Sequence, residues 1–159
     1  MRMFVFSLFA LLGALVAINN SAIAQVENPV RWSFNAKKID DRTFEVWATA
    51  TIAEPWHIYS QDSNGNLSRP TEFSFKNNPL VELVGKPREN GSVEKEDVDG
   101  SILKYFRRQV QFIQTVKLKP GIKAKTNLSG QVGYMACTDG HCLPEATRTF
   151  SISLDGTAN

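Results

Sequence analysis

The sequence lacks most of the features that would assign it to a large functional class. Its 159 residues include only two cysteines and two histidines, and its formal net charge at pH 7 is +2. Because the charges are interspersed, neither a nucleic-acid-binding face nor a polybasic membrane patch is expected. No Ser/His/Asp set, paired-carboxylate motif, glycine-rich phosphate loop or nucleotide-binding fingerprint stands out, so the common hydrolase and nucleotide-dependent classes are disfavoured.

Long apolar runs are also scarce, and the single one lies at the N-terminus. It extends from Phe4 to Ile18, follows Arg2, and precedes the small residues Ala22 and Ala24. At about fifteen residues it is shorter than the roughly 20 that a membrane helix needs. We therefore expect a signal peptide over residues 1–24, no stable membrane insertion, and one mature domain over residues 25–159.

The mature sequence is rich in short segments typical of β-strands, and no segment shows a convincing helical stripe of apolar residues. Apolar side chains alternate with polar ones in several of these segments, and turn residues separate them. This pattern predicts an all-β fold, favours a β-sandwich and disfavours a thioredoxin-like scaffold. The predicted strands are Val30 to Phe34, Thr43 to Ile52, Trp56 to Tyr59, Phe73 to Phe75, Leu80 to Val84, Leu103 to Leu118, Thr126 to Ala136 and Thr147 to Leu154.

The segment from Asn90 to Gly100 is polar, acidic and poor in apolar residues. It is expected to be a mobile loop or a solvated connection within a hairpin.

The two cysteines, Cys137 and Cys142, are separated by Thr-Asp-Gly-His, which has the composition of a tight connection. In an oxidising compartment the two sulfurs can form a disulfide. A loop of about six residues gains only roughly 2 kcal/mol from loop closure, so a purely structural role is the weaker expectation. A redox-active pair is therefore favoured over a structural disulfide.

Neighbouring residues give conflicting indications about cysteine reactivity. His141 could stabilise the Cys142 thiolate or carry a proton to it, whereas the carboxylate of Asp139 would disfavour a thiolate. A third possibility is a copper or zinc site made from a soft set of ligands. Its candidates are Cys137, Cys142, His141, His57 and Met135. The spacing does not match a structural zinc site, so metal binding ranks last.

The segment Trp56-His57-Ile58-Tyr59 should be a strand with His57 and Tyr59 on one face and Trp56 and Ile58 on the other. The simplest interpretation is a core strand whose polar tips are half exposed.

Together, the Trp-His-Ile-Tyr strand, the acidic segment before a long strand and the sequence Gly133-Tyr-Met-Ala-Cys-Thr-Asp-Gly-His-Cys-Leu-Pro144 resemble the N-terminal periplasmic domain of the thiol:disulfide interchange protein DsbD. The resemblance covers about Val30 to Leu154, and its specific part is the cysteine segment. It implies an immunoglobulin-like sandwich in the periplasm with no cofactor other than the dithiol. The implied reaction takes electrons from a thioredoxin-like donor and passes them to periplasmic disulfide isomerases and cytochrome c maturation proteins.

The resemblance also implies roles for individual residues. Cys142 corresponds to the cysteine that forms mixed disulfides, and Cys137 to the one that resolves them. Tyr59 and His57 resemble aromatic positions beside the active site. The segment Glu96-Asp97-Val98-Asp99-Gly100 resembles a loop that caps the cysteines, with Val98 in place of the usual aromatic tip, so weaker shielding is expected.

The membrane and thioredoxin-like domains that accompany this domain in the family are not in this sequence. The partners are therefore expected to be thioredoxin-fold periplasmic proteins and a membrane electron donor on a separate chain. The competing interpretation is a non-enzymatic binding module in which the disulfide only fastens the end of a strand.

Overall fold

The computed structural model describes residues 28–64, 68–122 and 125–154, and the predicted signal peptide over residues 1–24 lies outside them. Eleven strands are present in the described ranges. They are β1 Val30–Lys38, β2 Thr43–Ile52, β3 His57–Tyr59, β4 Glu72–Phe75, β5 Val81–Asn90, β6 Val93–Val98, β7 Ser101–Arg107, β8 Gln109–Leu118, β9 Asn127–Tyr134, β10 Ala136–Cys137 and β11 Ala146–Ser153.

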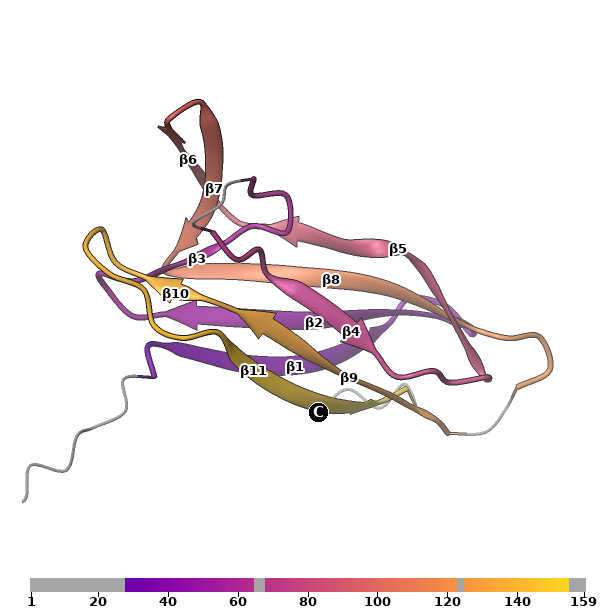
Figure 1. Ribbon diagram of the computed structural model, residues 1–159. Helices are drawn as coiled ribbons and strands as arrows, with labels where there is room; N and C mark the ends of the chain where they lie inside the picture. The colour runs from indigo at the N-terminus through magenta and orange to yellow at the C-terminus, as the bar shows by residue number, and fades with distance from the viewer. Residues whose placement is uncertain (1–27, 65–67, 123–124, 155–159) are drawn as a thin grey trace, which may run out of the picture.

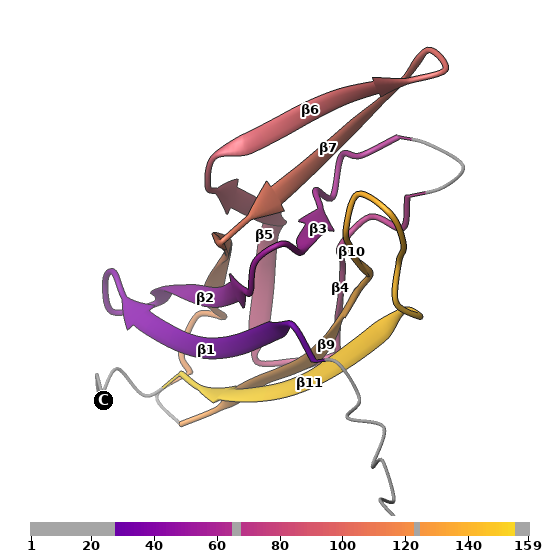
Figure 2. The same cartoon turned by 90° about the vertical axis from the view of Figure 1, so that its left-hand side faces the viewer.

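The strands form three antiparallel sheets, with orders β1-β2-β8-β5, β11-β9-β4 and β10-β3-β7-β6. Figure 1 shows the first two sheets as the layers of a sandwich, and Figure 2 shows the β6–β7 hairpin standing away from them. The prediction of an all-β fold is confirmed. Within the described ranges no helix is long and apolar enough to cross a membrane.

Alternation of side chains along β2 explains how the sandwich closes. Phe44, Val46, Ala48, Ala50 and Ile52 are all buried, as the period of two predicts. Phe44 and Val46 belong to an apolar cluster at one end of the molecule. Its other members come from both layers and include Val116, Leu118, Leu128, Phe150, Ile152 and Leu154. Burial of these side chains against one another holds the two layers together.

A second apolar cluster lies nearer the cysteines. It joins Val30 and Ile52 of the first sheet to Ile58, Phe106 and Ala136 of the third. The third sheet is therefore fixed to the sandwich through one of its faces, and side chains of its other face form the separate cluster that contains Cys137.

Two predicted strands are each divided in the structure. The segment Leu103 to Leu118 contains most of β7 and all of β8, which belong to different sheets and meet at Arg108, a residue with φ of 63°. The segment Thr126 to Ala136 likewise contains β9 and the beginning of β10. Continuous apolar patterning does not reveal a change of sheet, because both strands contribute to one interior.

The segment from Asn90 to Gly100 differs from the expected loop. Most of it is strand β6, which pairs with β7 along its whole length from Val93↔Phe106 to Val98↔Ser101. The side chains of β6 are almost all exposed, so no apolar alternation marks this strand in the sequence. Backbone hydrogen bonds to β7 define the strand instead.

Candidate functional site

The site lies on the face of the sheet β10-β3-β7-β6 that points away from the core of the sandwich. Ala136, Ile58 and Phe106 are opposite one another across three strands and point into the core. Because successive side chains on a strand point to opposite faces, the neighbours of these residues point outward. Those outward residues are Cys137 on β10, His57 and Tyr59 on β3, Leu103, Tyr105 and Arg107 on β7, and Glu94, Glu96 and Val98 on β6.

Cys137 and Cys142 form a disulfide across a tight hairpin, with their Cα atoms 4.0 Å apart. The backbone N–H of Thr138 donates to the carbonyl of His141 at 2.8 Å, and that of Leu143 donates to the carbonyl of the residue before Cys137 at 2.9 Å. The cysteines therefore occupy a non-hydrogen-bonded pair, the position in an antiparallel ladder where facing side chains are closest. The predicted pairing of the two sulfurs is present.

The two cysteines differ sharply in burial. Cys137 is only 1% exposed and belongs to a small cluster with Tyr59, Leu103 and Tyr105. Cys142, on the return side of the hairpin, is exposed. A protein partner can therefore reach one sulfur and not the other, as a stepwise exchange requires.

His57 lies directly opposite Cys137 in the pairing of β3 with β10. Its ring packs against Tyr59 at 5.4 Å and Tyr105 at 4.6 Å between ring centroids, and the residue is 6% exposed. Burial, followed by the positive charge of Arg107, lowers the pKa of His57 below its usual 6.5. The expected half-exposed polar tips are therefore absent, because His57 and Tyr59 are both buried.

Arg107 connects three parts of the site. Its guanidinium donates to Asp139 Oδ1 at 2.8 Å and to the carbonyl of Pro55 at 2.8 Å, and its Nε lies 3.5 Å from Glu94 Oε2. The guanidinium carbon is 5.3 Å from the ring centroid of Tyr105. One cation therefore links the loop between the cysteines to the β6–β7 hairpin.

This contact changes the expected influence of Asp139. The hydrogen bond from Arg107 lowers the pKa of Asp139, so the carboxylate stays ionised and its charge is compensated. The predicted repulsion between Asp139 and a thiolate is correspondingly weaker than the sequence suggests.

His141 lies on the exposed side of the cysteine hairpin. Its Nδ1 is 3.1 Å from Thr138 Oγ1, and its ring packs edge-on against Trp56 with 5.2 Å between the ring centroids. The side chain is therefore held by the loop and by the residue before β3. It is also adjacent in sequence to Cys142, the exposed cysteine.

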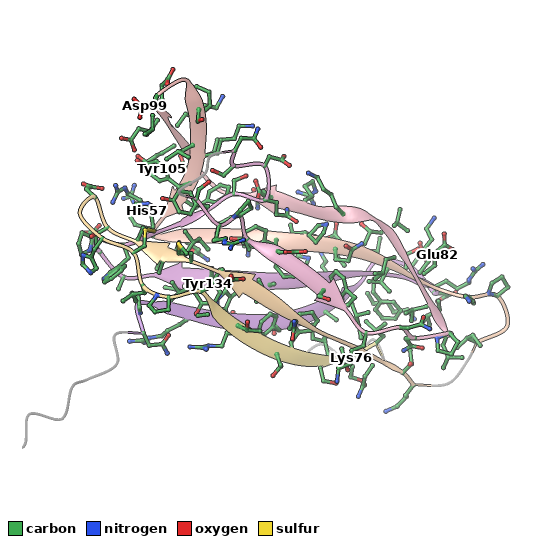
Figure 3. All side chains as sticks on the ribbon, viewed as in Figure 1. His57, Lys76, Glu82, Asp99, Tyr105 and Tyr134 are labelled. Atoms are coloured by element: carbon green, nitrogen blue, oxygen red, sulfur yellow. A yellow bond between two sulfur atoms is a disulfide. The ribbon has the colours of Figure 1, made fainter. Side chains whose placement is uncertain are left out.

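The predicted cap residues Asp97 and Val98 lie at the end of the β6–β7 hairpin. Asp97 Oδ1 accepts a hydrogen bond from the backbone N–H of Gly100 at 2.9 Å, which stabilises the turn. Val98 packs against the cluster that contains Cys137. In Figure 3 the turn residue Asp99 projects from the sandwich at the same end as His57, and Cys142 remains exposed.

Sequence reasoning did not select Arg107 or Tyr105, although both face the site. The available signal was alternation within β7, which places Leu103, Tyr105 and Arg107 on one face and Phe106 on the other. That signal becomes informative only when the partner strand is known. Among the described residues, no group of three or more His, Cys, Asp or Glu side chains is placed to hold a metal ion.

Comparison with known proteins relates this geometry to one family. The family model described as the N-terminal part of thiol:disulfide interchange protein DsbD matches residues 24–154. No curated protein matches the chain. The described fold is similar to the N-terminal periplasmic domain of ScsB from Proteus mirabilis, with a TM-score of 0.56, 18% identity, and coverage of 82% of this chain and 47% of that one.

Two structures from Neisseria meningitidis also match, each with 15% identity and a TM-score of 0.49. One is the DsbD N-terminal domain in its reduced form, with coverage of 77% of this chain and 84% of that chain. The other is a complex between the N-terminal domains of DsbD and PilB, with coverage of 76% of this chain and 80% of that chain.

The chain spans about half the length of the ScsB domain, and at this low identity the likeness to it concerns the fold alone. The family match is broader in scope, because it includes all of the described residues and both cysteines. It also confirms the predicted immunoglobulin-like sandwich. By fold and by sequence, the chain belongs to the family of DsbD N-terminal domains.

Proposed function

We propose that this protein relays electrons by thiol–disulfide exchange in the periplasm, taking them from a thioredoxin-like donor and passing them to periplasmic acceptor proteins. Domains of this family are periplasmic, use a cysteine pair for thiol–disulfide exchange and interact with thioredoxin-like partners. In this proposal the protein acts as a thiol-disulfide oxidoreductase, and Cys137 and Cys142 are its redox centre.

The unequal burial of the bonded cysteines carries the proposal. The Cys142 thiolate, which is exposed, attacks an acceptor disulfide and forms a mixed disulfide. Cys137 then attacks the Cys142 sulfur from within the aromatic cluster, which restores the internal disulfide and releases the reduced acceptor. In the opposite direction, a donor thiolate attacks Cys142 and Cys137 leaves.

Backbone contacts around the cysteines support exchange over a purely structural role. The hairpin is already closed by the hydrogen bonds from Thr138 to His141 and from Leu143 to the residue before Cys137. A disulfide is therefore not needed to fasten this end of the strand. This argument disfavours the alternative of a binding module with an inert bridge.

The decisive experiment traps the mixed disulfide. A Cys137→Ala variant keeps only Cys142 and is mixed with a purified thioredoxin-fold protein whose second active-site cysteine is replaced and whose remaining cysteine is activated as a mixed disulfide with nitrothiobenzoate; adducts are identified by mass spectrometry. We expect a stable one-to-one adduct through Cys142. The matched Cys142→Ala variant, which keeps only buried Cys137, should form none. Equal trapping by both variants, or trapping by neither, would contradict the proposal.

A further inference from the structure

His57 is a buried polar side chain whose hydrogen-bonding capacity is incompletely used. Its Nδ1 is buried and has no hydrogen-bond partner, although His57 itself is only 6% exposed. A buried polar atom without a partner is unfavourable, and such atoms are rare in folded proteins. The position is therefore a candidate for a group that forms a contact only during the reaction.

Cys137 is the reactive residue that strand pairing places opposite His57. The two residues are directly opposite in the pairing of β3 with β10 and point to the same face. Side chains opposite each other in an antiparallel pair have Cβ atoms roughly 4.5–5.5 Å apart, within reach of an imidazole ring and a sulfur. Cys137 cannot exchange its proton freely with solvent, because it is only 1% exposed.

We propose that His57 transfers the proton of Cys137, accepting it when Cys137 attacks the mixed disulfide and returning it when Cys137 leaves. This inference rests on the proposed function and assigns a specific step of it to His57. It goes beyond the resemblance, which implies only that this position lies beside the active site.

The surroundings of His57 suit an uncharged imidazole. Arg107 of β7 places a positive charge nearby, while Asp139 of the cysteine loop and Glu94 of β6 act in the opposite direction. Burial is the largest influence, so the pKa of His57 is lowered and the ring is neutral near pH 7. The hydroxyls of Tyr59 and Tyr105 are the other titratable groups of the rings that enclose it.

The step balances in atoms and electrons. Before it, Cys137 is a thiol and Cys142 is bonded to the partner sulfur. The thiol proton passes to His57, the Cys137 thiolate bonds to the Cys142 sulfur, and the bond from Cys142 to the partner breaks. The partner sulfur leaves as a thiolate with the electron pair of that bond and takes up the proton that His57 releases. Over the two attacks together, the dithiol has lost two electrons and the acceptor disulfide has gained them.

The test uses the reduced protein and the small disulfide 5,5′-dithiobis(2-nitrobenzoate). Attack by Cys142 releases a first nitrothiobenzoate in a bimolecular phase. Attack by Cys137 on the resulting adduct releases a second one in a phase whose rate does not depend on reagent concentration. The two phases separate the roles of the two cysteines without a protein partner.

Two variants of His57 are compared with the native protein from about pH 6 to pH 9. His57→Phe keeps an aromatic ring between Tyr59 and Tyr105, and His57→Gln keeps a polar group that does not titrate. Both should leave the first phase unchanged and slow the second by about tenfold or more near pH 7. The deficit should shrink as the pH rises towards 9, because hydroxide then increasingly replaces His57 as the base that removes the thiol proton. An Ile152→Val control, at the opposite end of the core, should slow neither phase.

The outcomes distinguish this inference from the proposed function. A second phase within about twofold of the native rate in both variants would overturn the role of His57 in proton transfer. A deficit that is equal at all pH values would also overturn it, because it would indicate a structural effect. If the native protein releases only one nitrothiobenzoate, Cys137 does not resolve adducts and the proposed function itself fails.

Discussion

Reduction of the disulfide should weaken the fold only slightly. The bridge joins residues five positions apart, so it closes a very short loop. For a loop of about six residues, the loop-closure relation gives an entropy near −7 cal/mol/K, or about 2 kcal/mol at 25 °C. The hydrogen bonds that close the hairpin on either side of Cys137 and Cys142 do not involve sulfur and should persist after reduction.

This magnitude can be measured in two independent ways. For a domain of roughly 130 residues, an unfolding entropy near 2.1 cal/mol/K per residue converts about 2 kcal/mol into a fall in Tm of about 8 °C. By thermodynamic linkage, the same free energy makes the folded disulfide harder to reduce than the unfolded one by only about 45 mV. Its potential should therefore lie above about −300 mV, outside the range typical of inert structural disulfides.

Thermal unfolding of the oxidised and reduced forms, together with a redox titration against glutathione, tests this reasoning. A Cys142→Ser variant is the matched control, since it removes the bridge at the exposed position and should unfold near the reduced protein. A loss above about 4 kcal/mol on reduction, or a reduced chain that is unfolded at 25 °C, would refute the argument and favour a structural bridge.

Three further predictions concern other parts of the molecule. Arg107→Gln should raise the pKa of Asp139 towards 3.8 in a carboxyl ¹³C titration, because the hydrogen bond from Arg107 is the main cause of the lowered pKa. The stability that this pair contributes is present above pH 3.8 and is lost as the pH falls through the lowered pKa of Asp139. An unchanged pKa would show that the pair does not form. Gly130→Ala should cost about 1–3 kcal/mol in urea unfolding, because its Cβ would lie 2.5 Å from a backbone oxygen of β4. Gly140→Ala, with nothing within 4 Å, is the neutral control, and equal effects would contradict the clash. Val98→Ala should change alkylation of the exposed cysteine in the reduced protein by less than about twofold, since that cysteine is already accessible; a large acceleration would show that Val98 shields it.

The fold was predictable from sequence where alternation was strong. The segment Thr43 to Ile52 is strand β2 with the predicted inward face, because apolar and polar residues alternate along all of it. Strand β6 was not recognisable, because its residues remain exposed on both faces and only pairing with β7 defines it. The division at Arg108 was equally hidden, since a change of sheet leaves the apolar pattern intact.

The candidate site was predictable only in part. The short spacing of Cys137 and Cys142 allowed the disulfide to be anticipated, and the period of two placed His57 and Tyr59 on one face. The contribution of Arg107 depends on residues distant in sequence, since its two ionic partners, Glu94 and Asp139, lie in two other segments of the chain. Sequence patterns describe one strand at a time, so contacts of this kind appear only once strand order and register are known.

The position of the cysteines at a non-hydrogen-bonded pair has a consequence for recognition. The backbone hydrogen bonds around the cysteines do not need the S–S bond. We therefore expect the reduced (dithiol) and oxidised (disulfide) forms to present nearly the same surface. A partner would then bind both forms equally well, and the oxidised form would compete with the reduced form for binding to an acceptor. Net electron transfer would follow the ratio of reduced to oxidised protein and the difference in reduction potential between partners. The supply of electrons, and not binding affinity, would therefore set the direction of electron transfer.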